Sequence, residues 1–240
     1  ARLVAGGNGS NTTWSGVISG TGGFDKRGNS IMVMAGTNTY TGSTTVSNGT
    51  LVVSGSSASS AHTVYPAGTL MGDGPVGALV VSGTVDPGNA VGDITILQSG
   101  AIQLLDGGIL KVDMDSVSGV AGTDWDMLNS YAGITAPASG TFTVKVLGNP
   151  AGFNNANNYS WKIMGGISAV SGFNANRFTV DSSGFFPNLD GGQFNVAQSG
   201  NDLLLTFTTG GGIPVWDGQG LDARWDTAAN WEGDLVPAGD

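Results

Sequence analysis

The sequence is poor in charge and contains no cysteine. Of its 240 residues only 11% are charged, against roughly 25% in an average soluble domain. The absence of cysteine excludes a disulfide framework and a thiolate metal site. Lysine and arginine together number eight and are scattered from Arg2 to Arg224. Because no basic stripe is available to hold phosphates, we expect no nucleic acid partner.

Long hydrophobic runs are absent as well. No stretch approaches the roughly 18–20 apolar residues of a membrane-spanning helix, so we expect no membrane insertion by this segment. What the chain does contain is 42 glycines and 40% hydrophobic residues. Glycine permits the positive φ of tight turns, and the apolar content is sufficient for a buried core. This composition favours an all-β fold of many short strands with very little helix.

A short motif recurs in which glycine precedes an apolar strand. Gly49, Gly68, Gly83 and Gly100 each open such a segment, at spacings of 19, 15 and 17 residues. These spacings are too short for a propeller blade and suit one coil of a parallel β-helix. The repeat therefore predicts a β-solenoid in which the four glycines occupy equivalent positions in successive coils.

Alternation within the strands separates a core face from a solvent face. Leu110, Val112 and Met114 alternate with polar residues, which predicts that all three point into the core. Between residues 193 and 208, two apolar runs flank a Ser-Gly-Asn-Asp turn, a pattern typical of an antiparallel hairpin. We therefore expect antiparallel pairing near the C-terminal end, and an exposed loop at 154–158.

Residues 210–240 differ in composition from the rest of the chain. Three glycines, Ile and Pro form a typical linker, and half of the six tryptophans follow it, at Trp216, Trp225 and Trp231. We divide the chain into a β-solenoid over 1–209 and a linker with a Trp-rich capping or junction segment over 210–240. Since clustered aromatic residues usually fill a core or an interface, we expect these tryptophans to form an interface.

One stretch resembles a known repeat. Residues 36–55 carry an Asn-x-Tyr-x-Gly-x-Thr-x-Val core followed by Gly-x-Leu, which resembles the autotransporter-associated β-strand repeat; the matching positions are Tyr40, Gly42, Thr44, Val46, Gly49 and Leu51. The lead-in from Trp14 is similar to what commonly precedes that repeat. The resemblance implies a right-handed parallel β-helix, secreted to the bacterial cell surface as part of a larger passenger polypeptide. It supplies no catalytic residues.

Two pairs of aspartates are candidates for chemistry. Asp113 with Asp115 and Asp124 with Asp126 are spaced i, i+2, which predicts that each pair shares one strand face while Trp125 points the other way. Such pairs could serve acid–base catalysis or bind calcium. However, few bases lie close by and no calcium-binding loop motif is present. We interpret the aspartates as solvent-facing residues and expect no catalytic residue, cofactor or metal.

The single histidine has no partner that would make it a site. His62 is accompanied by no cysteine, and no Gly-x-Ser-x-Gly elbow exists. We interpret His62 as a loop residue and 86–89, Asp-Pro-Gly-Asn, as a turn. The chain is not predicted to be an enzyme.

These observations favour a structural extracellular protein, a solenoid segment that builds a surface layer, stalk or fibre. Unpaired strand edges at the ends of a solenoid favour end-to-end self-association or stacking on neighbouring modules of the same chain. A second hypothesis is an adhesin that binds glycans or host surfaces through the loop at 151–158 or the Trp cluster. A third is a polysaccharide-active β-helix enzyme, which would require the aspartates to converge with a base.

Overall fold

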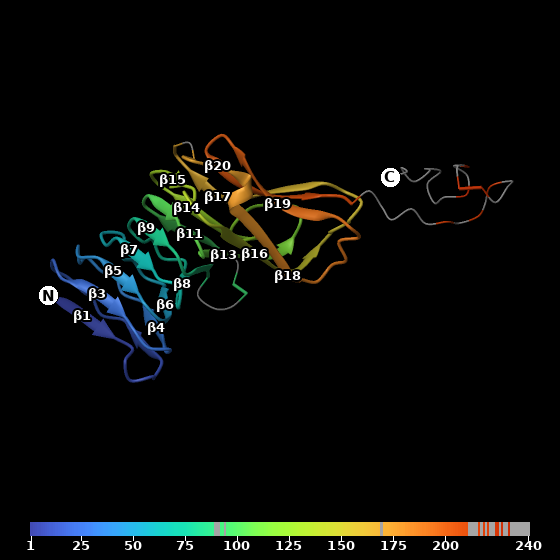
Figure 1. The fold of residues 1–240 in the computed structure, drawn as a ribbon. Coiled ribbons are helices and arrows are strands. Elements are labelled where there is room, and N and C mark those ends of the chain that lie inside the picture. The colour runs from blue at the N-terminus through green and yellow to red at the C-terminus, as the bar shows by residue number, and fades with distance from the viewer. Residues whose placement is uncertain are drawn as a thin grey trace.

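The structure is a computed structural model that describes residues 1–88, 92–93, 95–168 and 170–210, with seven further positions between 216 and 230. The described part is almost entirely β-strand, with one short 3-10 helix, η1 (Ala175–Arg177). Figure 1 shows its strands stacked along one direction, from β1 at one end to β18, β19 and β20 at the other. Among the described residues, no helix is long and apolar enough to cross a membrane.

The strands of the described residues form three sheets. Sheet A consists, in spatial order, of β1 (Arg2–Ala5), β3 (Gly23–Lys26), β5 (Thr44–Val46), β7 (His62–Val64), β9 (Leu79–Val81), β12 (Ile102–Leu104) and β15 (Ile134–Thr135). Sheet B consists of β2 (Thr12–Trp14), β4 (Ile31–Met34), β6 (Gly49–Val53), β8 (Gly68–Gly72), β10 (Thr84–Pro87), β13 (Ile109–Ser116), β16 (Phe142–Ala151) and β18 (Phe178–Phe185). Sheet C consists of β11 (Ile96–Ser99), β14 (Met127–Ser130), β17 (Tyr159–Gly166), β20 (Asp202–Thr208) and β19 (Gln193–Ser199).

The chain visits the three sheets in turn and so winds into coils. Each strand of sheets A and B pairs in parallel with the strand one coil later, as β3 does with β5 and β4 with β6. In the early coils the third side is joined by isolated parallel bridges, Thr37 to Ser56 and Ser57 to Val76. Regular strands of sheet C begin with β11. The predicted all-β parallel solenoid is confirmed.

The coils lengthen after β9 (Leu79–Val81), which overturns one detail of the predicted repeat. Gly49 and Gly68 pair with each other in sheet B, as expected. Gly100 instead precedes β12 in sheet A, where Ile102 pairs with Leu79. The prediction that Gly100 is equivalent to Gly49 is wrong, because extra residues between β10 and β11 shift the coil phase while the glycine spacing stays similar.

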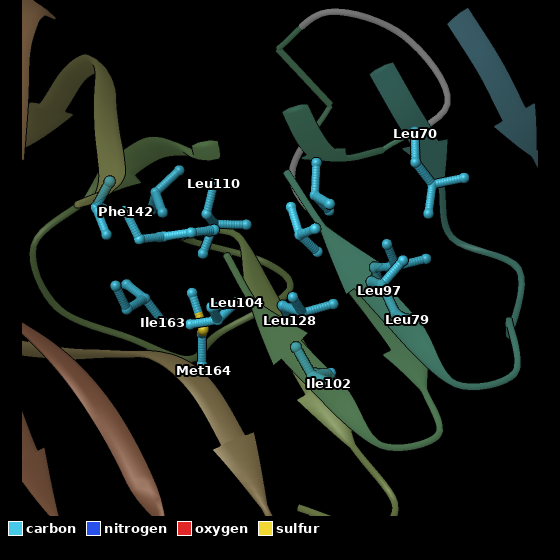
Figure 2. Close-up of a cluster of buried hydrophobic side chains, with 14 of the residues drawn as sticks. Leu70, Leu79, Leu97, Ile102, Leu104, Leu110, Leu128, Phe142, Ile163 and Met164 are labelled. Atoms are coloured by element: carbon cyan, nitrogen blue, oxygen red, sulfur yellow. The ribbon is translucent and has the colours of Figure 1, made fainter. Parts of the chain in front are cut away.

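Residues at matched register positions stack into apolar columns inside the solenoid. Leu70, Val85 and Leu110 follow one another in sheet B and are fully buried. Figure 2 shows the leucines of the three sheets gathered in one core, with Leu79 from sheet A and Leu97 from sheet C beside Leu70. Burial alternates along β13 as predicted. Each coil therefore stacks its apolar side chains on those of the coil before.

Antiparallel pairing appears at the C-terminal end of the described solenoid. β19 and β20 form the predicted hairpin, and β20 also pairs antiparallel with β17. Aromatic rings pack beside this hairpin, with the Phe153 ring 4.9 Å from that of Phe185 and 5.1 Å from that of Phe207. The adjoining turn at 154–158 is largely exposed, as predicted.

Coils stack so closely at the start of β8 that Gly68 has no room for a side chain. A Cβ atom there would lie 2.2 Å from the carbonyl oxygen of Val46 in the preceding coil. We expect Gly68→Ala to lower the free energy of unfolding by about 1–3 kcal/mol, as overpacked cores do. Gly7→Ala is the matched control, since a Cβ at Gly7 meets nothing within 4 Å. Equal urea midpoints for the two variants would contradict this account.

Candidate functional site

The first coil of the described residues has no strand paired on its outer side. β1 and β2 are the terminal strands of sheets A and B, so each is paired on one side only in the described residues. Leu3 pairs with Phe24 and Trp14 with Met34, at inward positions of the two sheets. Leu3 and Trp14 are nevertheless 49% and 48% exposed. The apolar columns of the core therefore end at the surface, next to free strand edges.

A shallow cavity of about 540 Å³ lies at this open end. Its walls come from β1, β2 and the turn between them, together with Ile18 and Met32. Exposed strand edges beside apolar surface are the usual setting for the addition of another strand. We call Leu3–Gly7, Thr12–Trp14, Ile18 and Met32 the open-coil surface.

Two arginines share one carboxylate beside the open-coil surface. Arg2 donates from Nε to Asp25 Oδ1 at 2.8 Å, and Arg27 from Nη2 to Asp25 Oδ2 at 3.1 Å. The hydrogen bond from Arg2 lowers the pKa of Asp25 to about 2. The carboxylate thus stays charged at neutral pH, and the cluster keeps a net positive charge.

Polar groups inside the solenoid join consecutive coils at the repeat that the sequence singled out. The Tyr40 hydroxyl lies 2.5 Å from Thr44 Oγ1, which lies 2.8 Å from Ser60 Oγ. Ser60 in turn donates to the carbonyl oxygen of Gly42 at 2.8 Å. Tyr40, Thr44 and Ser60 are all buried. The motif residues are therefore structural, because each polar group in this network is satisfied inside the core.

Asn38 extends this network in the same repeat. Its Oδ1 accepts from the backbone N–H of Ile18 at 2.9 Å, and its Nδ2 donates to the carbonyl oxygens of Gly36 and Ser56 at 2.8 and 3.0 Å. One buried side chain thus joins three successive coils. Sequence reasoning missed this role, although Asn38 is the first residue of the Asn-x-Tyr core.

Lys26 is a second residue that sequence reasoning missed. It is fully buried at the register position next to Val46, and burial lowers its pKa. Its Nζ donates to the carbonyl oxygens of Gly28, Arg27 and Asn48, at 2.8, 3.1 and 3.2 Å. All three ammonium donors therefore have backbone acceptors. The only sequence signal was a lysine at an inward position of the strand alternation.

Buried serines form the same kind of hydrogen bond between coils further along the chain. Each buried serine hydroxyl donates to a backbone carbonyl of the preceding coil: Ser60 to Gly42 at 2.8 Å, Ser99 to Gly77 at 3.0 Å and Ser130 to Gly100 at 2.6 Å. Glycine at the accepting position lets that corner lie close to the coil before it, since a Cβ at Gly77 would lie 2.2 Å from the carbonyl oxygen of Ser60. These contacts hold coil on coil without requiring a ligand.

His62 is not the loop residue that the sequence suggested. It lies in β7 and is fully buried. Its Nε2 lies 3.0 Å from Ser57 Oγ, and its Nδ1 lies 2.8 Å from the carbonyl oxygen of Ser60. Burial lowers the pKa of His62 to about 4. The loop interpretation failed because two hydrogen bonds allow this polar ring to occupy the core column between Thr44 and Leu79.

One member of each aspartate pair meets the other, since the backbone N–H of Asp113 donates to Asp126. Asp113 and Asp115 alternate outward along β13 as predicted, but Asp126 is fully buried, and Trp125 beside it is 8% exposed. Asp126 accepts from the backbone N–H groups of Thr95 and Asp113 at 2.8 and 3.0 Å. Burial raises its pKa to about 8. The expectation of solvent-facing carboxylates is wrong for Asp126, because it connects β13 to the segment before β11.

Asp86 is also part of a strand instead of a turn. It is buried in β10, and its Oδ2 accepts from Lys111 Nζ at 2.8 Å, while its Oδ1 has no hydrogen-bond partner. The turn interpretation failed because a lysine one coil later compensates the buried carboxylate. Within the described residues, no group of three or more histidine or acidic side chains is placed to hold a metal ion.

The tryptophan cluster is only partly within the described residues. The rings of Trp216 and Trp225 lie 5.6 Å apart, and the two side chains are 39% and 71% exposed. Trp231 lies outside the described residues, as does most of the 210–240 segment. The interface role of Trp216, Trp225 and Trp231 therefore stays a prediction, and so does the boundary at 209.

The buried His62 should make the free energy of unfolding fall as the pH is lowered. Its pKa falls from 6.5 in the unfolded chain to about 4 in the fold, so between these values the folded state binds fewer protons. Lowering the pH through this range should then cost up to about 3 kcal/mol of unfolding free energy. The measurement is the stability difference between the protein and His62→Gln at pH 7, 5 and 4. A difference independent of pH would contradict the buried neutral histidine.

Asp126 should have the opposite effect, so that the free energy of unfolding falls as the pH is raised. Its pKa rises from 3.8 to about 8 on folding, so the folded state binds more protons between these values and stability should fall as the pH rises. The loss from pH 6.5 to 8.5 should disappear in Asp126→Asn and remain in the control Asp124→Asn. Urea unfolding at both pH values measures it, and the same loss in both variants would overturn the assignment.

Comparison with known proteins agrees with the repeat geometry. Residues 24–53, from β3 to the end of β6, match the family model described as a passenger-associated-transport-repeat. Over 87 residues the chain is 44% identical to an extracellular serine protease of Serratia marcescens, a match that covers 35% of this chain and 8% of that protein. The chain thus corresponds to a small part of its relative's length. It carries an autotransporter passenger repeat within a parallel β-solenoid and is part of a secreted or cell-surface protein.

Proposed function

We propose that this chain is a structural segment of a larger secreted, passenger-like polypeptide, and that its first coil joins a further solenoid coil end to end. The observation that carries the proposal is the stacking of coil on coil in parallel register, with apolar columns and buried polar groups such as Thr44 and Ser60 joining one coil to the next. Among the described residues, the open-coil surface presents the same stacking face at Leu3 and Trp14. The further coil belongs either to the same polypeptide or to a second copy, and a second copy is what a solution of the purified 240 residues offers. Surface layers, stalks and fibres are built by such stacking.

The interior chemistry supports a structural role over a catalytic one. A Ser-His-Asp triad of the kind found in many serine proteases requires a histidine that substrate can reach, and His62, the single histidine of the chain, is fully buried. Polysaccharide cleavage would require a free acid and base in a groove. Of the carboxylates considered for this reaction, Asp126 is buried. The nearby base, Lys111, is paired with Asp86. The polar groups of the repeat are used to join coils.

A second candidate function is glycan adhesion through the Trp cluster. The neighbouring, partly exposed rings of Trp216 and Trp225 favour it, since indole faces can stack on sugars. A glycan array probed with the protein and with Trp225→Ala tests this candidate. Retention that the variant loses supports adhesion, and no retention removes it.

End-to-end joining should weaken when charge is placed at the open-coil surface. Lysine at Leu3 and Trp14 would add two ammonium groups where the core columns end. Each lost apolar contact of this size is worth about 1.5–3 kcal/mol, so self-association should weaken at least roughly tenfold. Sedimentation velocity over a concentration series measures the change.

Val120→Lys is the matched control for this experiment. Val120 is 62% exposed and lies in the segment after β13, far along the chain from the first coil. We expect its association to equal that of the unaltered protein. Monomers at every concentration of the unaltered protein, or equal weakening by both sets of substitutions, would contradict the proposed joining.

A further inference from the structure

A shielded ion pair joins two consecutive coils on the outer face of sheet B. Val85 pairs with Leu110, and both are fully buried in the core, so the next residues of the two strands, Asp86 in β10 and Lys111 in β13, face outward side by side. Lys111 Nζ donates to Asp86 Oδ2 at 2.8 Å. The side chain of Asp86 is 2% exposed and that of Lys111 is 27% exposed. Two paired strands therefore hold an amine against a carboxylate that water barely reaches.

The carboxylate of Asp86 is only partly satisfied. In the part of the chain that the structure describes, its Oδ1 is the one buried side-chain oxygen or nitrogen without a hydrogen-bond partner. A buried charge with an unpaired oxygen is costly, and such an atom in a folded protein calls for a chemical explanation. An amide between Lys111 and Asp86 would remove both charges and leave a single neutral carbonyl oxygen in their place.

A second carboxyl group on the same face can take up a proton. Asp113 follows Lys111 by two residues in β13 and so faces outward as well. Burial, together with the negative charge of Asp86, raises the pKa of Asp113, which also interacts with the charge of Lys111. A carboxylate with a raised pKa is a better proton acceptor. Amide formation needs such a group, because an ammonium must lose a proton before its nitrogen can attack.

We propose that Lys111 and Asp86 form an intramolecular amide bond, with Asp113 as the proton acceptor. After giving a proton to Asp113, Lys111 Nζ attacks Cγ of Asp86, so that the Nζ–Cγ bond forms and one Cγ–Oδ bond breaks. The departing oxygen takes two of the three ammonium protons, one of them through Asp113, and leaves as water. The two charges cancel, and no oxidant, reductant or co-reactant is consumed. Fixed placement of the two groups by neighbouring strands supplies the proximity that this reaction requires.

The bond forms within one chain, so it does not depend on the proposed end-to-end joining. It would tie one coil of the solenoid covalently to the next, closing the segment between residues 86 and 111. Such a closed loop restricts the unfolded chain and thereby stabilises the fold.

The mass of the intact protein tests the bond. We expect the purified protein, unfolded before the measurement, to be lighter than its sequence by one water molecule. A protease digest should then contain one branched peptide that includes both Asp86 and Lys111. Lys111→Arg keeps a positive charge beside Asp86 but replaces the amine by a guanidinium that stays protonated, so this variant should have its full mass. A full mass for the unaltered protein would overturn the inference.

Lys145→Arg is the matched control for this variant. Lys145 pairs with Lys111 in the register one coil later, and its partner Asp181 lies 3.2 Å away on a more exposed surface. This control should keep the loss of water. An aspartate before a glycine, such as Asp106, can also lose water by closing to a succinimide, but alkali reopens that ring and leaves an amide intact. Loss of water in Lys111→Arg, or its reversal by alkali, would therefore count against the amide.

Asp113→Asn tests the proton transfer. Chain isolated in urea should have the full mass and lose water only after transfer to buffer, because folding brings residues 86 and 111 together. Asp113→Asn should slow this loss roughly a hundredfold. Asp115→Asn, at an exposed position of the same strand, should leave the rate unchanged. Equal rates in the two variants would overturn the role of Asp113, while the mass of the native protein decides on the bond itself.

Discussion

The parallel backbone pairing of one coil with the next is the constraint on which the rest of the structure depends. It brings successive coils to roughly the 4.8 Å spacing of paired strands, and this spacing decides which residues fit. A corner residue such as Gly68 lies against the backbone of the coil below, so it has no room for a side chain. Inward positions such as Leu70 and Val85 are covered from above and below, and they are apolar for that reason.

The same stacking explains why polar residues occur in the core. A buried side chain meets the backbone carbonyls of a neighbouring coil, and Ser60, Asn38 and Lys26 donate to those of Gly42, Ser56 and Asn48 respectively. A buried polar group paired in this way avoids most of the cost of desolvation and fixes the register of its coil. The repeat therefore holds coils together through both apolar and polar contacts. Its buried side chains have a structural role.

The sequence predicted features that depend on neighbouring residues and missed those that depend on coil length. Alternation along β13 and the turn between β19 and β20 are local patterns, and both are present. The position of Gly100 in its coil depends on the length of the segment between β10 and β11. The spacing of the glycines does not reveal that length. Asp126 was misread because its partner Thr95 becomes a neighbour only through the winding of the chain. His62 was misread because nothing in the sequence pattern shows that the nearby Ser57 would satisfy its ring inside the core.

The open-coil surface is the part of the candidate site that follows most directly from this constraint, because in the described residues β1 and β2 are paired on one side only and leave Leu3 and Trp14 exposed. The central claim is that such stacking continues beyond the first coil. Electron microscopy of the purified chain over a range of concentrations tests it most directly. The account predicts rods that lengthen by whole multiples of one particle as concentration rises. Particles of a single length at every concentration would contradict it.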